Sequence, residues 1–166
     1  DWDFIERIKT EGNVYQIYAN KVGWYNGNNL KKDDPDVYNR AKVSVLQLGY
    51  QSGWQKFQST AKINYGVDLT DEESKRLVTE YRAANPKIVD LWTFHHQNAS
   101  VSCLEDKDDI HAIDLPSGRV LTYYKPHMRK SEDGRYEMVV YPILGGIPSR
   151  MYGGKFVENV CQAISR

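Results

Sequence analysis

The sequence predicts a mainly helical fold that carries a small antiparallel β element, the α+β class. Apolar side chains recur at helical spacing through the first part of the chain. Helix-start signals divide this part, among them Pro35 and a capping box from Thr70 to Glu73. The composition then changes, because runs rich in β-branched and aromatic residues flank Pro116-Ser117-Gly118. We expect helices over residues 1–104, a β-hairpin element over 109–143 and a last helix over 153–166.

The composition is that of a soluble domain with no overall charge. The 166 residues are enough to bury a core. Lys plus Arg and Asp plus Glu are equal at 22, so any contact with nucleic acid has to be local. No apolar run is long enough for a membrane span, and no signal-peptide pattern opens the chain. Cys103 and Cys161 form no CxxC motif, which favours reduced thiols, and we expect a cytoplasmic protein with no membrane partner.

The N-terminal region predicts two short helices followed by a loop. Apolar residues between Trp2 and Thr10 have near-helical spacing, and Gly12 ends that helix. Asn13 is a good N-cap for a second helix over Val14–Val22. The glycine- and asparagine-rich stretch that follows predicts a loop over Gly23–Asp34.

The central helix, which begins at Pro35, carries a stripe of three different residue types. On an α-helix Lys42, Leu46 and Tyr50 lie one above another, with Gly49 beside them. An ammonium group can hold a phosphate, and an apolar side chain and a phenol ring can bracket a base and sugar. The same spacing also fits a surface lysine above two core residues. Spacing alone leaves both interpretations open.

Three further helices are predicted before the composition changes. An apolar stripe starts at Trp54 and runs to Tyr65-Gly66, and the capping box at Thr70 starts the next helix. Asn85-Pro86 marks the start of the third. His95-His96 are adjacent, so both rings cannot easily reach one metal ion from one helix face. We therefore assign no metal ligands.

The C-terminal part predicts strands and holds the densest cluster of cations and tyrosines. Pro116-Ser117-Gly118 and Asp133-Gly134 are turn signals, and a strand is expected over Tyr136–Ile143. A flexible link is expected between Gly145-Gly146 and Gly153-Gly154. The cluster can contact a nucleic-acid backbone by charge, or it decorates an exposed hairpin. Its members are Arg119, Tyr123, Tyr124, Lys125, His127, Arg129 and Lys130.

Five segments, taken in order, carry a resemblance to a known family. They are Ala41–Gly53, Tyr65–Glu73, Arg82–Trp92, Leu115–Leu121 and Tyr152–Arg166. They resemble the fingers region of A-family (DNA polymerase I-like) DNA polymerases, especially the phage-type branch. The resemblance implies a fingers subdomain that binds the incoming dNTP and the templating base of primer-template DNA. It also implies that the chain is a piece of a larger polymerase, with palm and thumb regions as partners.

The resemblance implies roles for individual residues. Lys42 would bind the triphosphate of the incoming dNTP, Leu46 would touch its sugar and base, and Tyr50 would lie at the insertion site. The last helix would return the chain toward the palm. The DNA-contact residues implied or favoured by charge are Gly49, Tyr50, Arg119, Lys125, Asn159 and Gln162.

One position departs from the pattern of the family. The family usually has an Arg four residues before the Lys, and here that position is Tyr38. Arg40 is the nearest arginine, a candidate dNTP ligand about 160° around the helix from Lys42. Lys31 and Lys32 of the preceding loop are alternative sources of the missing positive charge, or are simply solvated.

The resemblance places the chemistry outside this chain. A-family polymerases hold two Mg²⁺ ions with two palm carboxylates, and neither carboxylate is expected among these residues. We therefore assign no catalytic residue and expect the chain alone to be inactive. Two other functions remain open: a non-catalytic nucleic-acid-binding module with a fingers-like fold, and an interaction domain with neither ligand.

Overall fold

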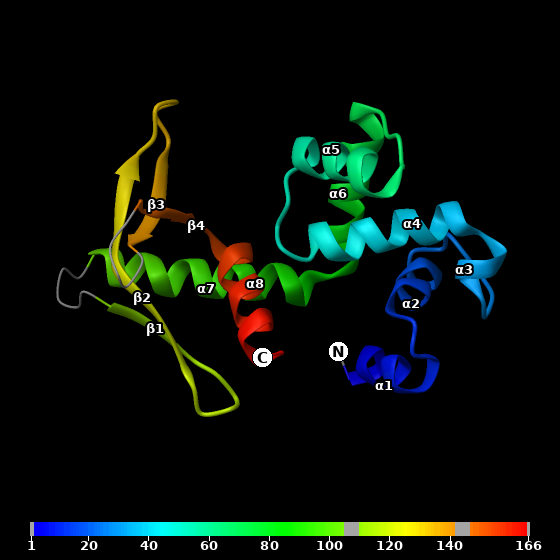
Figure 1. Cartoon of the computed structure of the whole chain (residues 1–166), viewed down its shortest axis with the longest axis horizontal. Helices are drawn as coiled ribbons and strands as arrows, with labels where there is room; N and C mark the ends of the chain where they lie inside the picture. Colours follow the sequence, from blue (N-terminus) through cyan, green and yellow to red (C-terminus); the bar gives the residue numbers. More distant parts are fainter. Residues whose placement is uncertain (1, 105–109, 142–146, 166) are drawn as a thin grey trace. The chain divides into compact units, whose positions relative to one another are not determined.

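The computed structural model describes residues 2–104, 110–141 and 147–165 and has the predicted α+β class (Figure 1). The chain forms two compact units, Asp1–Val89 and Asp90–Arg166, whose boundary lies within helix α7. The helices are α1 (Trp2–Glu11), α2 (Val14–Lys21), α3 (Leu30–Asp33), α4 (Pro35–Val43), the π-helix η1 (Ser44–Leu48), α5 (Trp54–Tyr65), α6 (Asp71–Ala84), α7 (Pro86–Leu104) and α8 (Gly153–Ile164). The strands are β1 (Ile110–Asp114), β2 (Val120–Lys130), β3 (Tyr136–Tyr141) and β4 (Ser149–Met151).

Side-chain caps start the helices of the first unit where the sequence predicts them. The Asn13 side chain accepts hydrogen bonds from the backbone N–H groups of Tyr15 and Gln16, at 3.2 and 3.3 Å. Thr70 and Glu73 form the predicted capping box, in which each side chain accepts from the backbone of the other. These bonds satisfy N–H groups that a helix start leaves without a partner.

The core of the first unit lies among α2, α4, α5 and α6. Phe57, Leu30 and Val43 are fully buried, and the ring of Tyr18 lies 5.6 Å from the ring of Tyr81. Burying a side chain of this size stabilises the unit by about 1.5–3 kcal/mol. The apolar spacing predicted these inward faces correctly, since Phe57 and Tyr81 are core residues.

The second unit is built on an antiparallel sheet in the order β1-β2-β3-β4. The register shifts between Tyr124 and His127, where Lys125 has a φ of 46° and Pro126 lacks an N–H for the ladder. Met138, Val140 and Met151 form a core with Ala99 of α7 and Phe156 of α8. Gly153 is required at the start of α8, because a Cβ there would overlap the backbone carbonyl of Trp92.

Two local expectations are wrong. The predicted loop Gly23–Asp34 contains the helix α3, whose Leu30 is fully buried. The predicted flexible link contains the strand β4, whereas α8 begins at Gly153, where the last helix was expected. Both elements are short and depend on burial or strand pairing, which local spacing does not reveal. Gly145-Gly146 and the last two residues of the predicted strand Tyr136–Ile143 lie outside the described residues.

Two buried histidines make the stability of the second unit depend on pH. Burial lowers the pKa of His95 and of His111, and the charge of His95 lowers the pKa of His111 further. His111 packs against the rings of Tyr123 and Phe156, at 6.1 and 5.6 Å between centroids. The folded unit therefore favours neutral imidazoles.

We predict that the second unit loses stability as the pH falls. The unfolded chain binds protons at the ordinary histidine pKa of about 6.5, whereas the folded unit binds them only at lower pH. Stability is therefore constant above that value and declines as the pH falls toward the lowered pKa. Thermal unfolding at a series of pH values measures the decline. A His95→Gln, His111→Gln double variant should flatten it, and an equally steep decline in this variant would contradict the prediction.

Candidate functional site

The central helix of the first unit changes its winding within the predicted site. It is α-helical to Val43, continues as the π-helix η1 over Ser44–Leu48 and ends in a turn. Lys42 therefore lies on α4, Leu46 on η1 and Tyr50 in the turn. The expectation of a stripe along one uninterrupted α-helix is wrong, because a π-helix places more residues in each turn. Single-turn π segments occur frequently at functional sites.

The turn after η1 is held by backbone bonds and an uncommon conformation. The N–H of Ser52 donates to the carbonyl of Gln47 at 3.3 Å, across Gln51 with a φ of 65°. This is the left-handed position at a helix end that glycine usually occupies. The turn therefore fixes the direction in which the chain leaves the site.

Gly49 allows close packing against other residues of the chain itself. A Cβ at Gly49 would lie 2.7 Å from the carbonyl oxygen of Val45 and 3.3 Å from the hydroxyl oxygen of Tyr81. Burial raises the pKa of Tyr81 to about 12, and the charge of Tyr50 contributes to this rise. Gly49 is thus packed against Tyr81 of α6.

Three cations around α4 lie over aromatic rings. The Lys42 ammonium is 5.7 Å from the centroid of Tyr65, at the end of α5. The Arg40 guanidinium is 5.9 Å from the ring of Trp24, which follows α2. The structure thus places Arg40 and Lys42 against different segments and does not bring them together as a pair. Aromatic faces attract cations weakly, by about 0.5–1 kcal/mol at exposed sites.

Helix α3 brings a further cation to the ring of Tyr38 on α4. The Lys31 ammonium lies 5.9 Å from the ring centroid of Tyr38, four residues before Lys42. The Tyr38 ring is held in turn by an edge-to-face contact with Tyr15, at 5.6 Å. Tyr38, which holds Lys31, and Lys42 are four residues apart on α4, so their positions share one face of that helix. The aromatic partners Trp24 and Tyr65 were missed in the sequence, because they lie outside α4 and reach the cations only in the folded unit.

The predicted DNA-contact residues of the second unit gather partly at α8. Arg119 donates to the carbonyl oxygen of Ala163 near the end of α8 and, at 3.2 Å, to the Ser117 hydroxyl. Asn159 donates to the Tyr123 hydroxyl at 3.2 Å. Burial raises the pKa of Tyr123 above its usual value, and the hydrogen bond from Asn159 offsets only part of this rise. A cation at a helix C-terminus is favourable, so Arg119 also has a structural role.

The remaining two members are placed differently. Gln162 donates to Glu158 at 3.1 Å along the exposed side of α8. Lys125 is exposed at the bulge of β2 and is not joined to the α8 residues by any contact that the described residues show. A β-bulge redirects the side chain at its position. The structure thus brings Arg119 to α8 with Asn159 and Gln162, and leaves Lys125 apart.

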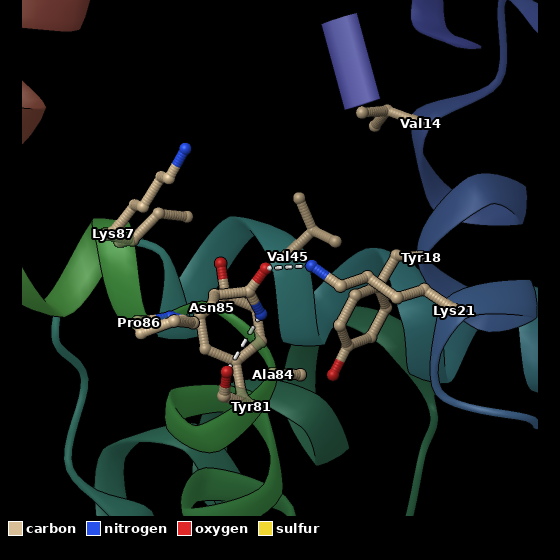
Figure 2. A pocket seen from close by; sticks show the side chains of 10 residues that line it. Val14, Tyr18, Lys21, Val45, Tyr81, Ala84, Asn85, Pro86 and Lys87 are labelled. Carbon is tan, nitrogen blue, oxygen red and sulfur yellow. Dashed lines mark hydrogen bonds between the residues drawn. The ribbon is translucent and has the colours of Figure 1, made fainter. Parts of the chain in front are cut away.

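An apolar cavity lies behind η1 in the first unit (Figure 2). Its volume is about 320 Å³, and Val45, Tyr18 and Tyr81 form much of its wall. At its edge the Lys21 ammonium donates to the side-chain oxygen of Asn85 at 3.4 Å, and the Asn85 amide donates to the Tyr81 carbonyl at 2.8 Å. Lys42, Leu46 and Tyr50 do not line this cavity, so it is separate from the predicted dNTP site.

The described residues contain neither a group of metal ligands nor a helix suited to a membrane span. In residues 2–104, 110–141 and 147–165, no three His, Cys, Asp or Glu side chains are grouped so that they could hold a metal ion. None of the helices in these ranges combines the length and apolar character needed to cross a bilayer.

Comparison with known proteins points to a polymerase. A DNA polymerase of Bacillus phage SP02 is 29% identical to this chain over 180 residues. The match covers 98% of the chain and 27% of the phage protein, so the chain spans about a quarter of the length of that relative. No protein-family model matches the chain, and no solved structure matches it. The chain is therefore similar to part of a phage DNA polymerase along almost its whole length.

We predict that Gly49→Ala destabilises the first unit by about 1–3 kcal/mol, because the added methyl group has to displace a backbone carbonyl. Gly53→Ala is the matched control, since a Cβ there meets nothing within 4 Å. Urea unfolding of both variants measures the difference. Equal stability of the two variants would show that the contact with Val45 and Tyr81 is not tight.

Proposed function

We propose that this chain is the fingers part of a DNA polymerase, where it binds the incoming dNTP and the templating base of primer-template DNA. The observation that carries the proposal is the pair of lysines held at rings, Lys31 at Tyr38 and Lys42 four residues after Tyr38. Lys42 precedes Leu46 and Tyr50 in a chain that is similar to part of a phage polymerase. The A-family assignment belongs to this proposal.

The two lysines suit a triphosphate because of how they are held. Lys42 is half-buried and Lys31 exposed, and both rest on a ring rather than on a carboxylate. Each keeps its full positive charge for the phosphates. Lys31 supplies the charge that Tyr38 lacks, and Arg40, which lies at Trp24, is the second candidate for that role.

The other components of the reaction come from elsewhere in this proposal. DNA polymerases use Mg²⁺, which neutralises charge on the transferring phosphates. In this proposal the metal is held by the palm. Palm and thumb regions and primer-template DNA are the partners, and the cytoplasm of a bacterium or phage-infected host is the setting.

A second candidate function is a nucleic-acid-binding module that has kept a fingers-like fold but takes no part in catalysis. It predicts DNA binding without any response to dNTP. Both functions would use the cation that Lys31 places over Tyr38, one for the triphosphate and the other for the DNA backbone. The dNTP dependence of the next experiment separates the two.

We predict a graded loss of dNTP use in the complete polymerase. Lys42→Ala should lower kcat/KM for dNTP by about 100-fold, the scale of one lost contact to a charge that develops in the transition state. Lys31→Ala should lower it by roughly tenfold, since its contact is more exposed. Lys32→Ala is the control and should leave it unchanged. Single-turnover primer extension measures all three.

Duplex binding should change little in these variants. Equal losses in kcat/KM for the Lys31, Lys32 and Lys42 variants would indicate a general loss of charge. No loss in any of them would show that the lysines are solvated and would favour the non-catalytic module.

The resemblance also predicts the response of the enzyme to substrates that lack the 3′-hydroxyl. At the position of Leu46 the family commonly has Phe or Tyr, and of these three side chains only tyrosine has a hydroxyl that can hydrogen-bond near the sugar. Leu46→Tyr should therefore relax discrimination against dideoxynucleotides by about 1–3 kcal/mol. Leu46→Phe adds the ring without the hydroxyl and should not. Competition between dNTP and ddNTP in single-turnover extension measures the ratio, and equal ratios in all three proteins would show that residue 46 does not face the sugar.

A further inference from the structure

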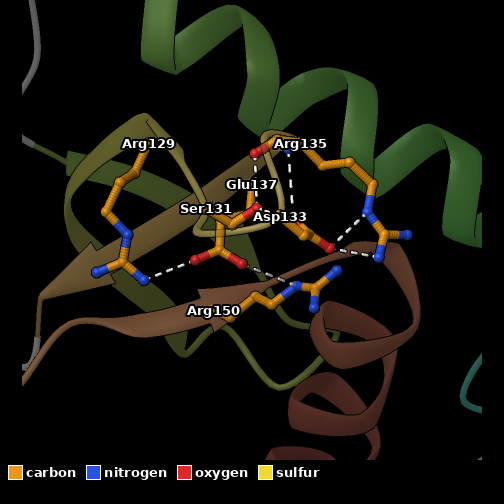
Figure 3. Close-up of polar contacts among 6 residues, drawn as sticks. All are labelled: Arg129, Ser131, Asp133, Arg135, Glu137 and Arg150. Carbon is orange, nitrogen blue, oxygen red and sulfur yellow. Dashed lines mark hydrogen bonds and ion pairs between the residues drawn. The ribbon is translucent and has the colours of Figure 1, made fainter.

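Three strands of the second unit bring two arginines to one carboxylate (Figure 3). Arg129 of β2 donates through Nη2 to Oε1 of Glu137 on β3 at 2.6 Å. Arg150 of β4 pairs through Nε with Oε2 of the same carboxylate at 3.4 Å. The Glu137 side chain is only 12% exposed, whereas those of Arg129 and Arg150 are 50% and 68% exposed. We call Arg129, Glu137 and Arg150 the arginine clamp.

The register of the sheet places the clamp on the face opposite to Met138, Val140 and Met151. Arg129 lies directly opposite Glu137, and Arg150 lies opposite Val139, two residues further along β3. Side chains alternate between the faces of a sheet, so these positions share one face. Met138, Val140 and Met151 occupy the other face and pack in the core. Val139 is fully buried on the same face as the clamp, but the side chains of Arg129 and Arg150 reach solvent.

The clamp keeps a net positive charge and unused donors. One carboxylate neutralises one of the two guanidinium groups, and each guanidinium has five N–H donors. Both arginines belong to the wall of a polar hollow of about 710 Å³, in which four side chains are cationic and three are carboxylates. At its other end, the Ser131 hydroxyl and Arg135 hold the pKa of Asp133 below its usual range, so this carboxylate is already engaged.

We propose that the arginine clamp binds the phosphate backbone of duplex DNA, a contact separate from the dNTP site and from Arg119 and Lys125. The inference rests on the proposed function for its choice of DNA as the polyanion. Glu137 fixes two guanidinium groups side by side before the ligand arrives, which lowers the entropic cost of binding. Planar guanidinium groups donate two parallel bonds to phosphate oxygens, and the backbone contact needs no particular sequence.

The surroundings of the clamp favour a duplex over a single strand. Single strands are usually held by bases that stack on aromatic rings. Tyr136 is an exposed aromatic residue that lines the same hollow, but it lies opposite Lys130 in the register, at positions that alternate with those of Arg129 and Glu137. The clamp itself thus offers charge and donors without a stacking platform.

The test measures binding of the 166-residue chain to a fluorescein-labelled DNA duplex and to one of its strands, by anisotropy over a range of salt concentrations. Arg129→Gln with Arg150→Gln should weaken duplex binding by about tenfold and lower the slope of log affinity against log salt by about two, one for each lost phosphate contact. Arg76→Gln with Arg82→Gln removes the same charge from exposed positions on α6 and should leave duplex binding within about twofold of the unmodified chain.

A second pair separates the clamp from simple charge. Arg129→Lys with Arg150→Lys keeps both charges but loses the paired donors, so affinity should fall about threefold while the salt slope stays. Melting temperatures identify any variant that fails to fold, and the lysine pair still tests the proposal if the glutamine pair unfolds.

Three results would overturn the clamp: equal losses in the clamp and α6 variants, a loss confined to the single strand, or no duplex binding by the unmodified chain. The fingers proposal has its own test in the dNTP dependence of Lys31 and Lys42. Failure of the clamp alone, with that dependence intact, therefore leaves the proposed function standing.

Discussion

The contact between Gly49 and Tyr81 decides where the central helix of the first unit ends, and the candidate dNTP site depends on that end point. Tyr81 is 3% exposed and packs on Tyr18, so its hydroxyl group has a fixed position and limits how closely the backbone at residue 49 can approach α6. Because Gly49 has no side chain, the backbone can come close to this hydroxyl group. The π-helix η1 accommodates one more residue per turn than an α-helix would in the segment just before Gly49. The chain then turns through Gln51, whose left-handed conformation costs about 1–2 kcal/mol. The turn positions Tyr50, whereas α4 positions Lys42. The places of these two residues therefore depend on different parts of the structure.

The parts of the fold that could be predicted are those encoded locally. Asn13, Pro35 and the box from Thr70 to Glu73 mark helix starts by hydrogen bonds and backbone angles that involve only neighbours in sequence. The turn Pro116-Ser117-Gly118 does the same for the first hairpin. Helix α3, strand β4 and η1 escaped prediction, because each depends on a partner distant in sequence. β4 has three residues and exists through its pairing with β3, and η1 depends on α6.

The candidate sites divide in the same way. The spacing of Lys42, Leu46 and Tyr50 is a property of the sequence, but which rings hold the cations is a property of the packing. Lys31 reaches Tyr38 because α3 folds back, and no local pattern contains that contact. The pairing of Arg129 with Glu137 in the arginine clamp could have been predicted from the sequence. A hairpin closed at Asp133-Gly134 pairs Arg129 with Glu137 by counting outward from the turn, whereas Arg150 required knowledge of β4.

A chain with no net charge can still bind a polyanion, and its two units keep positive charge available by different means. Around α4, Lys31, Arg40 and Lys42 rest on aromatic rings, which hold a cation without neutralising it. A phosphate has to compete only with a weak attraction of about 0.5–1 kcal/mol, so such a cation can move to its ligand. In the arginine clamp a carboxylate holds the cations, which orders them more firmly and cancels part of their charge. In the proposed function, cations held by rings therefore suit the dNTP, which binds anew in each round of nucleotide addition. Arginines held by a carboxylate suit the phosphate backbone of DNA, which is bound without regard to its sequence.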